Sequence, residues 1–394
     1  MTNKTTLPRA PKRRLSWNDP GVRSLIYQVL ILGIVGFAIW YLVSNTLHNL
    51  AVRNISTGFD FLDREAGFAI GESSIDYTPA DTYGRAIWVG LLNTLRVSVV
   101  GIIAATIFGT LLGVARLSKN WLLSRVASAY IEVMRNVPLL LQLFFWYAII
   151  TESTPGPRDA LNPLPGVFIS NRGLKLPSLQ GDALDWIVGG LAIAIVGILL
   201  LAHWARKRQD ATGQIFPLAR VGILLLVALP VAGWLLSGAT LTVELPELKG
   251  FNFAGGISLS PEFTALLAGL VIYTSAFVAE VVRSGIQSVN QGQWEAAGAI
   301  GLSRARVLRL VILPQALRVI VPPMTSQYLN LTKNSSLAVA IGYPDIVSVV
   351  NTTLNQTGQA IEGILIIMAA YLSVSLSISV FMNWYNKRIA LVER

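Results

Sequence analysis

The residues best suited to chemistry in this chain lie in a polar stretch at positions 284–318. Six of them follow a fixed spacing: Glu295, Ala296, Ala297, Gly301, Leu313 and Pro314. The two alanines permit close packing, Gly301 permits a backbone conformation that a Cβ atom disfavours, and Glu295 offers a hydrogen-bond acceptor. The pattern predicts two short helices joined at Gly301, the second capped by Ser303 and ended by Pro314.

Charged side chains inside apolar segments form a second group of candidates, because charge at bilayer depth is costly and marks a functional site by default. Glu280 follows small and polar residues at 273–279, a composition unlike that of a lipid-facing surface. Two interpretations of Glu280 stay open, a functional site at membrane depth or an ion pair with Arg283. Glu132 and Arg135 are spaced to pair with each other along a helix.

Polar residues also follow Pro322 and Pro323 in the seventh apolar segment. A proline cannot donate its backbone hydrogen bond, so the pair is expected to interrupt this helix. Interrupted helices at membrane depth occur where they line a cavity. Gln327, Asn330 and Lys333 are therefore expected to line a pathway or to form an interface with a second protein, and the two possibilities do not exclude each other.

The composition excludes several classes of protein. Of 394 residues, 53% are hydrophobic and 13% charged, which excludes a disordered chain and disfavours an ordinary soluble enzyme. The chain has no cysteine and only His48 and His203, so neither thiolate nor histidine-rich metal sites are expected. It contains no P-loop and no G-x-S-x-G element. We therefore predict no catalytic residue, metal or cofactor, and a membrane-embedded enzyme is the weakest alternative.

Eight apolar segments are long enough to cross a bilayer, which takes about 20 residues per helix. They are residues 24–44, 87–114, 128–150, 184–202, 218–237, 263–282, 319–341 and 362–383. With the N-terminus inside, the inner connections carry 21 Lys and Arg and the outer loops carry 7. This bias predicts that both termini are cytoplasmic. It also accounts for the net charge of +10 without a nucleic-acid partner.

The spacing within residues 284–318 resembles the EAA loop of ABC-importer permeases, in which Glu-Ala-Ala is followed by three residues, Gly, nine residues and Ile-x-Leu-Pro. Val311 stands here in place of the isoleucine. Further segments are similar to the polar-amino-acid branch of that family: residues 135–142, 283–286, 292–293 and 333–337. The branch more often has Arg-Gly-Thr-Pro and Lys-Asp-Thr-Ser in two of these places.

The resemblance covers residues 86–150 and 262–394 and implies a core of five spanning helices. Residues 1–85 would add a cytoplasmic tail, one helix and a periplasmic segment, and residues 151–261 would insert two more helices. This long form resembles the Q-type permease subunit of general L-amino-acid ABC importers. The expected fold is an all-α polytopic membrane protein of about eight spanning helices, with turns rather than regular elements at 151–183.

The resemblance also implies a function, which is ATP-driven import of polar L-amino acids across a bacterial inner membrane. The EAA loop would couple to cytoplasmic ABC ATPase subunits, a second homologous permease would complete the pore, and a periplasmic amino-acid-binding protein would deliver substrate. An acidic residue at the position of Glu280 would lie by the path. The remaining pathway candidates are Gln142, Gln327, Asn330 and Lys333.

Two other interpretations stay open. A self-sufficient ion-coupled secondary amino-acid transporter would fit buried charges and an interrupted helix, although no internal repeat of the expected kind is visible. The second interpretation concerns the helix after Gly301, which could rest on lipid headgroups as an amphipathic surface helix. Separate ATPase chains that bind the loop would exclude both.

Overall fold

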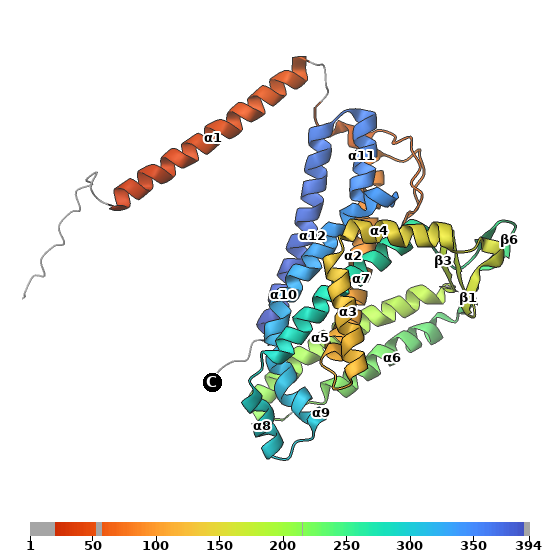
Figure 1. Ribbon diagram of the computed structural model, residues 1–394. Coiled ribbons are helices and arrows are strands. Elements are labelled where there is room, and N and C mark those ends of the chain that lie inside the picture. Colours follow the sequence, from red (N-terminus) through yellow and green to blue (C-terminus); the bar gives the residue numbers. More distant parts are fainter. Residues whose placement is uncertain (1–19, 53–56, 215, 390–394) are drawn as a thin grey trace, which may run out of the picture.

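The computed structural model describes residues 20–52, 57–214 and 216–389 (Figure 1). The basic tail at 1–19 and the last five residues lie outside this range, so the predicted cytoplasmic location of the two termini stays a prediction. The long helices are α1 (Pro20–Val52), α2 (Tyr83–Arg116), α5 (Ala183–Thr212), α6 (Leu218–Ser237), α7 (Pro261–Gln287), α10 (Leu313–Asn334) and α12 (Ala360–Ile389).

The shorter helical elements complete this list: α3 (Trp121–Asn136), α4 (Leu139–Ala148), α8 (Gln291–Ala299), α9 (Arg304–Val307), α11 (Ile346–Thr357), the 3-10 turns η1 (Asp60–Asp63), η3 (Pro157–Asp159) and η5 (Ser335–Ile341), and the π-helical turns η2 (Ile149–Ser153) and η4 (Leu308–Ile312). Within the described residues, seven helices are long and apolar enough to span a membrane, or eight with a bent pair counted as one span. The predicted polytopic helical fold is therefore confirmed.

Helix α7 lies at the centre of the bundle and packs against α2, α3, α4 and α10. Its contact with α2 is close because glycines replace larger residues at the interface. A Cβ atom on Gly109 would lie 2.6 Å from the side chain of Val278, and one on Gly113 would lie 2.7 Å from the backbone oxygen of Ala279. The small-residue pattern on α2 thus serves packing inside one chain.

The third predicted span is not one straight helix. Helices α3 and α4 meet at an angle of 106°. Pro138 lies between them in an extended conformation, and the residue before a proline is itself disfavoured in the helical region. The segment predicted at 128–150 is therefore sharply bent in its middle, as in a broken span or a re-entrant loop.

The prolines expected to end or interrupt helices do neither. Helical backbone runs without a break from Arg304 to Ile341 through α9, η4, α10 and η5. Pro314 lies in the first turn of α10, after the wider π turn η4, which accommodates a residue that cannot donate its backbone bond. Pro322 and Pro323 lie inside α10 and are exposed. Both expectations, the one for Pro314 and the one for the pair Pro322 and Pro323, were wrong.

The predicted insertion at 151–261 contains strands that the sequence analysis missed. They are β1 (Leu161–Leu164), β2 (Val167–Ser170), β3 (Gly173–Leu176), β4 (Ser178–Gln180), β5 (Thr242–Glu244), β6 (Glu247–Lys249), β7 (Asn252–Ala254) and β8 (Ile257–Leu259). Strand β3 pairs with β8 directly before α7, so the segment starts and ends at one place. Each strand has three or four residues, too few for an alternating pattern to stand out.

Helices α5 and α6 form a hairpin beside the bundle, and α1 stands apart from it (Figure 1). The hairpin is held by close backbone contact, since a Cβ atom on Gly233 would lie 2.4 Å from the backbone oxygen of Trp186. None of the most apolar 18-residue window of α1 is buried by the chain. Nearly all the described side chains of α1 are therefore exposed.

Candidate functional site

The loop after α7 folds as two short helices that meet at Gly301, as predicted. Asn290 begins α8 by accepting a hydrogen bond from the backbone of Gly292 at 2.8 Å. Ser303 occupies the cap position of α9, although its side chain makes no capping bond. Gln315 on α10 donates to the side chain of Gln293 at 3.5 Å, which ties α8 to the start of α10.

Gly301 ends α8 because it adopts a left-handed conformation, with φ of +78°. Its N–H donates to Gly298 at 2.9 Å, and the N–H of Leu302 donates to Ala297 at 3.3 Å. These two bonds form a Schellman motif, which satisfies carbonyls that the helix end would otherwise leave free. A Cβ atom on Gly301 would meet no atom within 4 Å, so backbone conformation alone demands glycine there.

The predicted loop residues divide into an anchor and an exposed surface. Ala297 is 4% exposed and packs with Val307 and Ile312, which holds α8 against the bundle. Glu295 and Ala296 are exposed. Ile300 at the tip is 76% exposed. The exposed side of α8 and its end thus offers a carboxylate, a small side chain and a large apolar side chain on a helix that is held in place.

Leu313 and Pro314 begin the long helix α10 and link this surface to the bundle. Leu313 is 41% exposed, and Pro314 lies half-buried. Helical backbone is continuous on both sides of this pair, so a displacement of α9 moves the start of α10 with it.

Glu280 is the centre of an ion-pair cluster. Arg116, the last residue of α2, donates to Glu280 at 2.6 Å, and Arg283 donates to both carboxylate oxygens from one turn further along α7. The predicted pair of Glu280 with Arg283 is confirmed. Sequence spacing could not reveal Arg116, which lies 164 residues away. The cluster joins the ends of α2 and α7 that lie nearest α8.

The predicted pair of Glu132 with Arg135 does not form in the described chain. Glu132 is instead 3.9 Å from Arg116, and the guanidinium of Arg135 lies over the ring of Phe277 at 5.2 Å. Both side chains turn toward helices that pack against α3, because tertiary contacts outweigh the small gain of an exposed pair one turn apart.

Gln142 supports the bend between α3 and α4. It is 5% exposed, and its amide donates to the backbone oxygens of Met134 and Val137 at 3.0 Å each. These oxygens belong to the last turn of α3, where helical partners are missing. The amide is therefore engaged with the backbone of its own chain.

The polar residues predicted on α10 lie at one exposed side of that helix. Asn330 and Lys333 are exposed and Gln327 is half-buried. The buried residues of the same helix include Met324, Leu331 and Thr332. Within a segment that spans a membrane, exposed amide and ammonium groups require a partner other than lipid tails.

Comparisons with known proteins identify the family. Residues 212–391 match the family described as binding-protein-dependent transport system inner membrane component. A general L-amino acid transport system permease protein of Rhizobium johnstonii is 50% identical over 97% of this chain and 96% of its own length. A putative amino-acid ABC transporter permease protein of Escherichia coli is 50% identical over 97% and 98%. A glutamate/glutamine/aspartate/asparagine transport system permease protein of Rhodobacter capsulatus is 42% identical over 95% and 96%.

The chain belongs to this family of permeases. It is a multi-pass component of the inner membrane and the permease subunit of an ABC transporter. Its role is transport rather than catalysis, and ATPase subunits are its partners.

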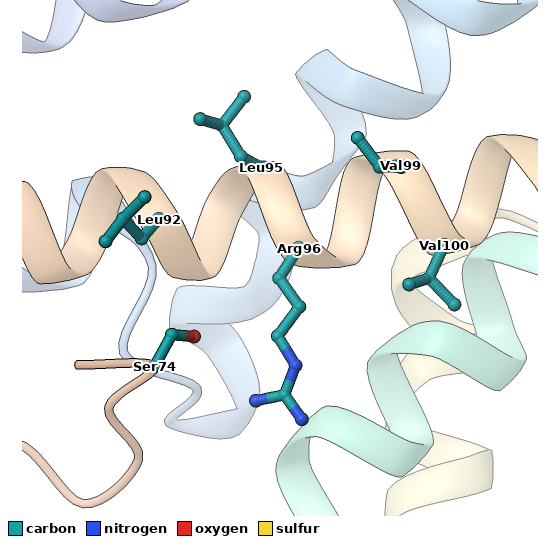
Figure 2. A pocket seen from close by; sticks show the side chains of 6 residues that line it. All are labelled: Ser74, Leu92, Leu95, Arg96, Val99 and Val100. Atoms are coloured by element: carbon teal, nitrogen blue, oxygen red, sulfur yellow. The ribbon is translucent and has the colours of Figure 1, made fainter. Parts of the chain in front are cut away.

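The permease also contains a cluster of polar contacts around Glu72 that sequence analysis missed. Arg96 of α2 extends toward the segment that carries Ser74 and toward α7 (Figure 2). Its guanidinium donates to Glu72 at 2.8 Å and lies over the ring of Phe263 at 4.5 Å. Glu72 also accepts a hydrogen bond from Ser260 directly before α7. The sequence feature that could have indicated this cluster is Arg96, a charged residue in an apolar segment with no partner nearby in sequence.

The same segment is fixed through Asn93, which is fully buried. Its amide donates to the backbone oxygens of Glu72 at 2.8 Å and Pro344 at 3.0 Å. The segment before α2 is thereby tied to α2, α7 and the loop before α11, so it forms part of the folded permease rather than a free linker.

Proposed function

We propose that this permease passes polar L-amino acids inward and forms half of a translocation pore. ATPase subunits bind the surface of α8 and α9, a second homologous permease completes the pore, and a periplasmic amino-acid-binding protein delivers the substrate. In this proposal residues 86–150 and 262–394 are the permease core, and residues 1–85 and 151–261 are additions to it.

The observation that carries the proposal is the division of α8 into an anchored and an exposed side. Ala297 is buried against the bundle, whereas Glu295 and Ala296 face outward. A push on the exposed side is therefore transmitted through Ala297 to Ile312 and the start of α10. The ion-pair cluster at Glu280 joins α2 and α7 close to the same end.

The exposed polar side of α10 supports the proposal that a second permease completes the pore. Asn330 and Lys333 are exposed in the single chain, and a neighbouring permease at this surface would enclose them in a shared polar channel. Amides and an ammonium group can hydrogen-bond the carboxylate end of an amino acid. Glu280, already held by two arginines, would act beside that path as a fixed charge.

The proposed substrate class, polar L-amino acids, rests on how the relatives are described. Two of them are described as amino-acid permeases in general terms, and the third is described by glutamate, glutamine, aspartate and asparagine. The exposed polar side chains of α10 suit the charged ends that all amino acids share.

The test is uptake of labelled amino acids into proteoliposomes that contain the complete transporter, its binding protein and enclosed ATP. The Ala296→Arg variant places a bulky charge on the exposed side of α8 without altering a buried contact. We expect it to insert normally, to lose the ATPase subunits on purification and to lose uptake.

The matched control is Gln209→Arg, which adds the same side chain at an exposed position of α5, outside α8 and α9. It should bind the ATPase and support uptake. Full uptake by Ala296→Arg would contradict the coupling surface. Uptake driven by an ion gradient without ATP would instead favour the ion-coupled alternative.

A further inference from the structure

Helices α1 and α12 share a feature that sets them apart from the other long helices of the described chain. Among the seven helices that are long and apolar enough to span a membrane, these two have a most apolar 18-residue window of which nothing is buried. Met368, Leu372 and Leu376 lie one turn apart along α12 and are 61%, 61% and 55% exposed. These three residues define the outward side of α12.

The segment that follows α1 is fastened to the first turns of α12. The N–H of Gly58 donates to the carboxylate of Glu362 at 2.8 Å, and Glu362 is 8% exposed. Three residues after Gly58, Phe61 is 1% exposed and belongs to one hydrophobic cluster with Ile366 and Ile367 of α12. The chain just beyond α1 is therefore fixed at the start of α12.

The short connection keeps the end of α1 close to this point. Val52 is the last residue of α1, and Gly58 follows it after residues 53–57. Even a fully extended chain of this length spans no more than about 22 Å. This limit is about two helix diameters, so the last turn of α1 lies at most one helix away from a neighbour of α12.

A bilayer also restricts the direction of α1. Spanning helices tilt on average by about 20° from the bilayer normal, so two spans that are joined at one end run side by side. Figure 1 shows α1 inclined to α12 and directed away from the bundle. No bilayer acts on the isolated chain, whereas insertion of both helices into one membrane makes them nearly antiparallel.

The two helices match in length when both are counted from their joined ends, Val52 of α1 and Ala360 of α12. Arg23 lies 29 residues before Val52, and Arg388 lies 28 residues after Ala360. At a rise of about 1.5 Å per residue, the two arginines lie within about 2 Å of the same level. Antiparallel packing therefore brings both basic residues to one side of the membrane, which is the arrangement that basic residues of membrane proteins favour.

We propose that α1 packs antiparallel against the outward side of α12 in the membrane, with Trp40 at the level of Leu372. Each of these residues lies 12 positions from the joined end of its helix. Because the connection is short, the contact is intramolecular and has an effective concentration of roughly millimolar, so weak packing between the helices is sufficient. The contact does not use the exposed polar residues of α10.

Disulfide crosslinking in membranes that contain the complete transporter tests the contact. The chain has no cysteine, so each pair can be introduced without other changes. Leu372→Cys is combined in turn with a cysteine at each of residues 38–41, which cover one turn of α1 and include whichever side faces α12. On mild oxidation, at least one of the four pairs should form a disulfide within one chain about tenfold faster than the control pairs, as mass spectrometry of the peptides would show.

Two controls separate packing from random collision. The first replaces Leu372→Cys by Val99→Cys, a 54% exposed position on α2. The second combines Leu47→Cys with Leu376→Cys, whose levels in the membrane differ by about 16 Å in the proposed arrangement.

Three results would overturn the proposal. In the first, no pair with Leu372→Cys reacts faster than the controls. In the second, the pairs with Val99→Cys react fastest, which would place α1 against α2. In the third, disulfides form only between two copies of the chain, which would place α1 against a neighbouring permease.

Discussion

Gly298 lies in the last turn of α8, and Gly301 lies just after the end of that helix. Substitution by alanine should change the local stability of α8 in opposite directions at these two positions. Gly301 has φ of +78°, whereas Gly298 is inside the helix, and a Cβ atom on either would meet nothing within 4 Å. Because neither site is crowded, any difference between Gly301→Ala and Gly298→Ala comes from backbone conformation alone. The pair therefore isolates the role of the Schellman motif in holding α8.

The expected magnitudes follow from that geometry. A side chain forced into the left-handed region costs about 1–2 kcal/mol, so Gly301→Ala should weaken the end of α8 by this amount. Alanine inside a helix is favoured over glycine by about 0.5–1 kcal/mol, so Gly298→Ala should strengthen it. The two variants should then differ by about 1.5–3 kcal/mol in the local opening free energy.

Hydrogen exchange measured by mass spectrometry on the transporter in lipid nanodiscs gives this free energy locally. In a peptide that covers residues 288–303, Gly301→Ala should exchange about 5–30 times faster than the unaltered chain. Gly298→Ala should exchange more slowly. A peptide from the buried part of α7 should stay unchanged and serves as the internal reference.

A third variant separates conformation from side-chain size. Asn adopts the left-handed region more readily than Ala, so Gly301→Asn should fall between the unaltered chain and Gly301→Ala. If Gly301→Ala exchanges as slowly as the unaltered chain, or if both alanine variants change in the same direction, the assignment of Gly301 to a required left-handed conformation is refuted.

Three further predictions concern stability in detergent. Glu72→Gln should lower the free energy of unfolding by about 1–2 kcal/mol, less than a fully buried pair loses, because the side chain of Arg96 is 30% exposed and partly screened. Gly109→Ala should lower it by about 1–3 kcal/mol, since the added Cβ would overlap a side chain of α7. Burial raises the pKa of Asp345 from 3.8 to about 7, so the folded chain binds this proton more tightly than the unfolded chain. Stability should therefore fall as pH rises between these values, and Asp345→Asn should remove that dependence in thermal unfolding scans.

Each of these variants has a matched control among exposed or uncrowded positions. Glu65→Gln and Asp76→Asn change exposed carboxylates, and Gly189→Ala adds a Cβ that meets nothing within 4 Å. The first two should leave the unfolding midpoint and its pH dependence unchanged, and the third should not lower the midpoint. Shifts of equal size in a control and its test variant would count against the structural explanation.

Local signals in the sequence were sufficient for several features of the permease. Long apolar segments predicted the spanning helices, and the spacing around Gly301 predicted the two short helices that meet there. Both depend on residues close together in the chain. The expectations that prolines would end or interrupt helices were less successful. Pro314 follows a π turn that accommodates it, and Pro322 and Pro323 lie on an exposed side of α10.

The strands at 161–180 and 242–259 escaped detection for a different reason. They are short, and β3 finds its partner β8 more than eighty residues later. No periodic pattern in either strand indicates such a pairing. The bend after α3 was hidden as well, because an apolar run of ordinary length spans it.

Hydropathy and motif spacing are local properties, so they were enough to predict the spanning segments, the position of the loop at 284–318 and the family. The uses of the polar side chains depend on how the helices pack. This packing joined Glu280 to Arg116 and Glu72 to Arg96, turned Gln142 to a helix end and left Lys333 exposed. The physical reason is that a buried charge or amide takes whichever partner the packing of helices brings near, and that partner is not marked by distance along the chain.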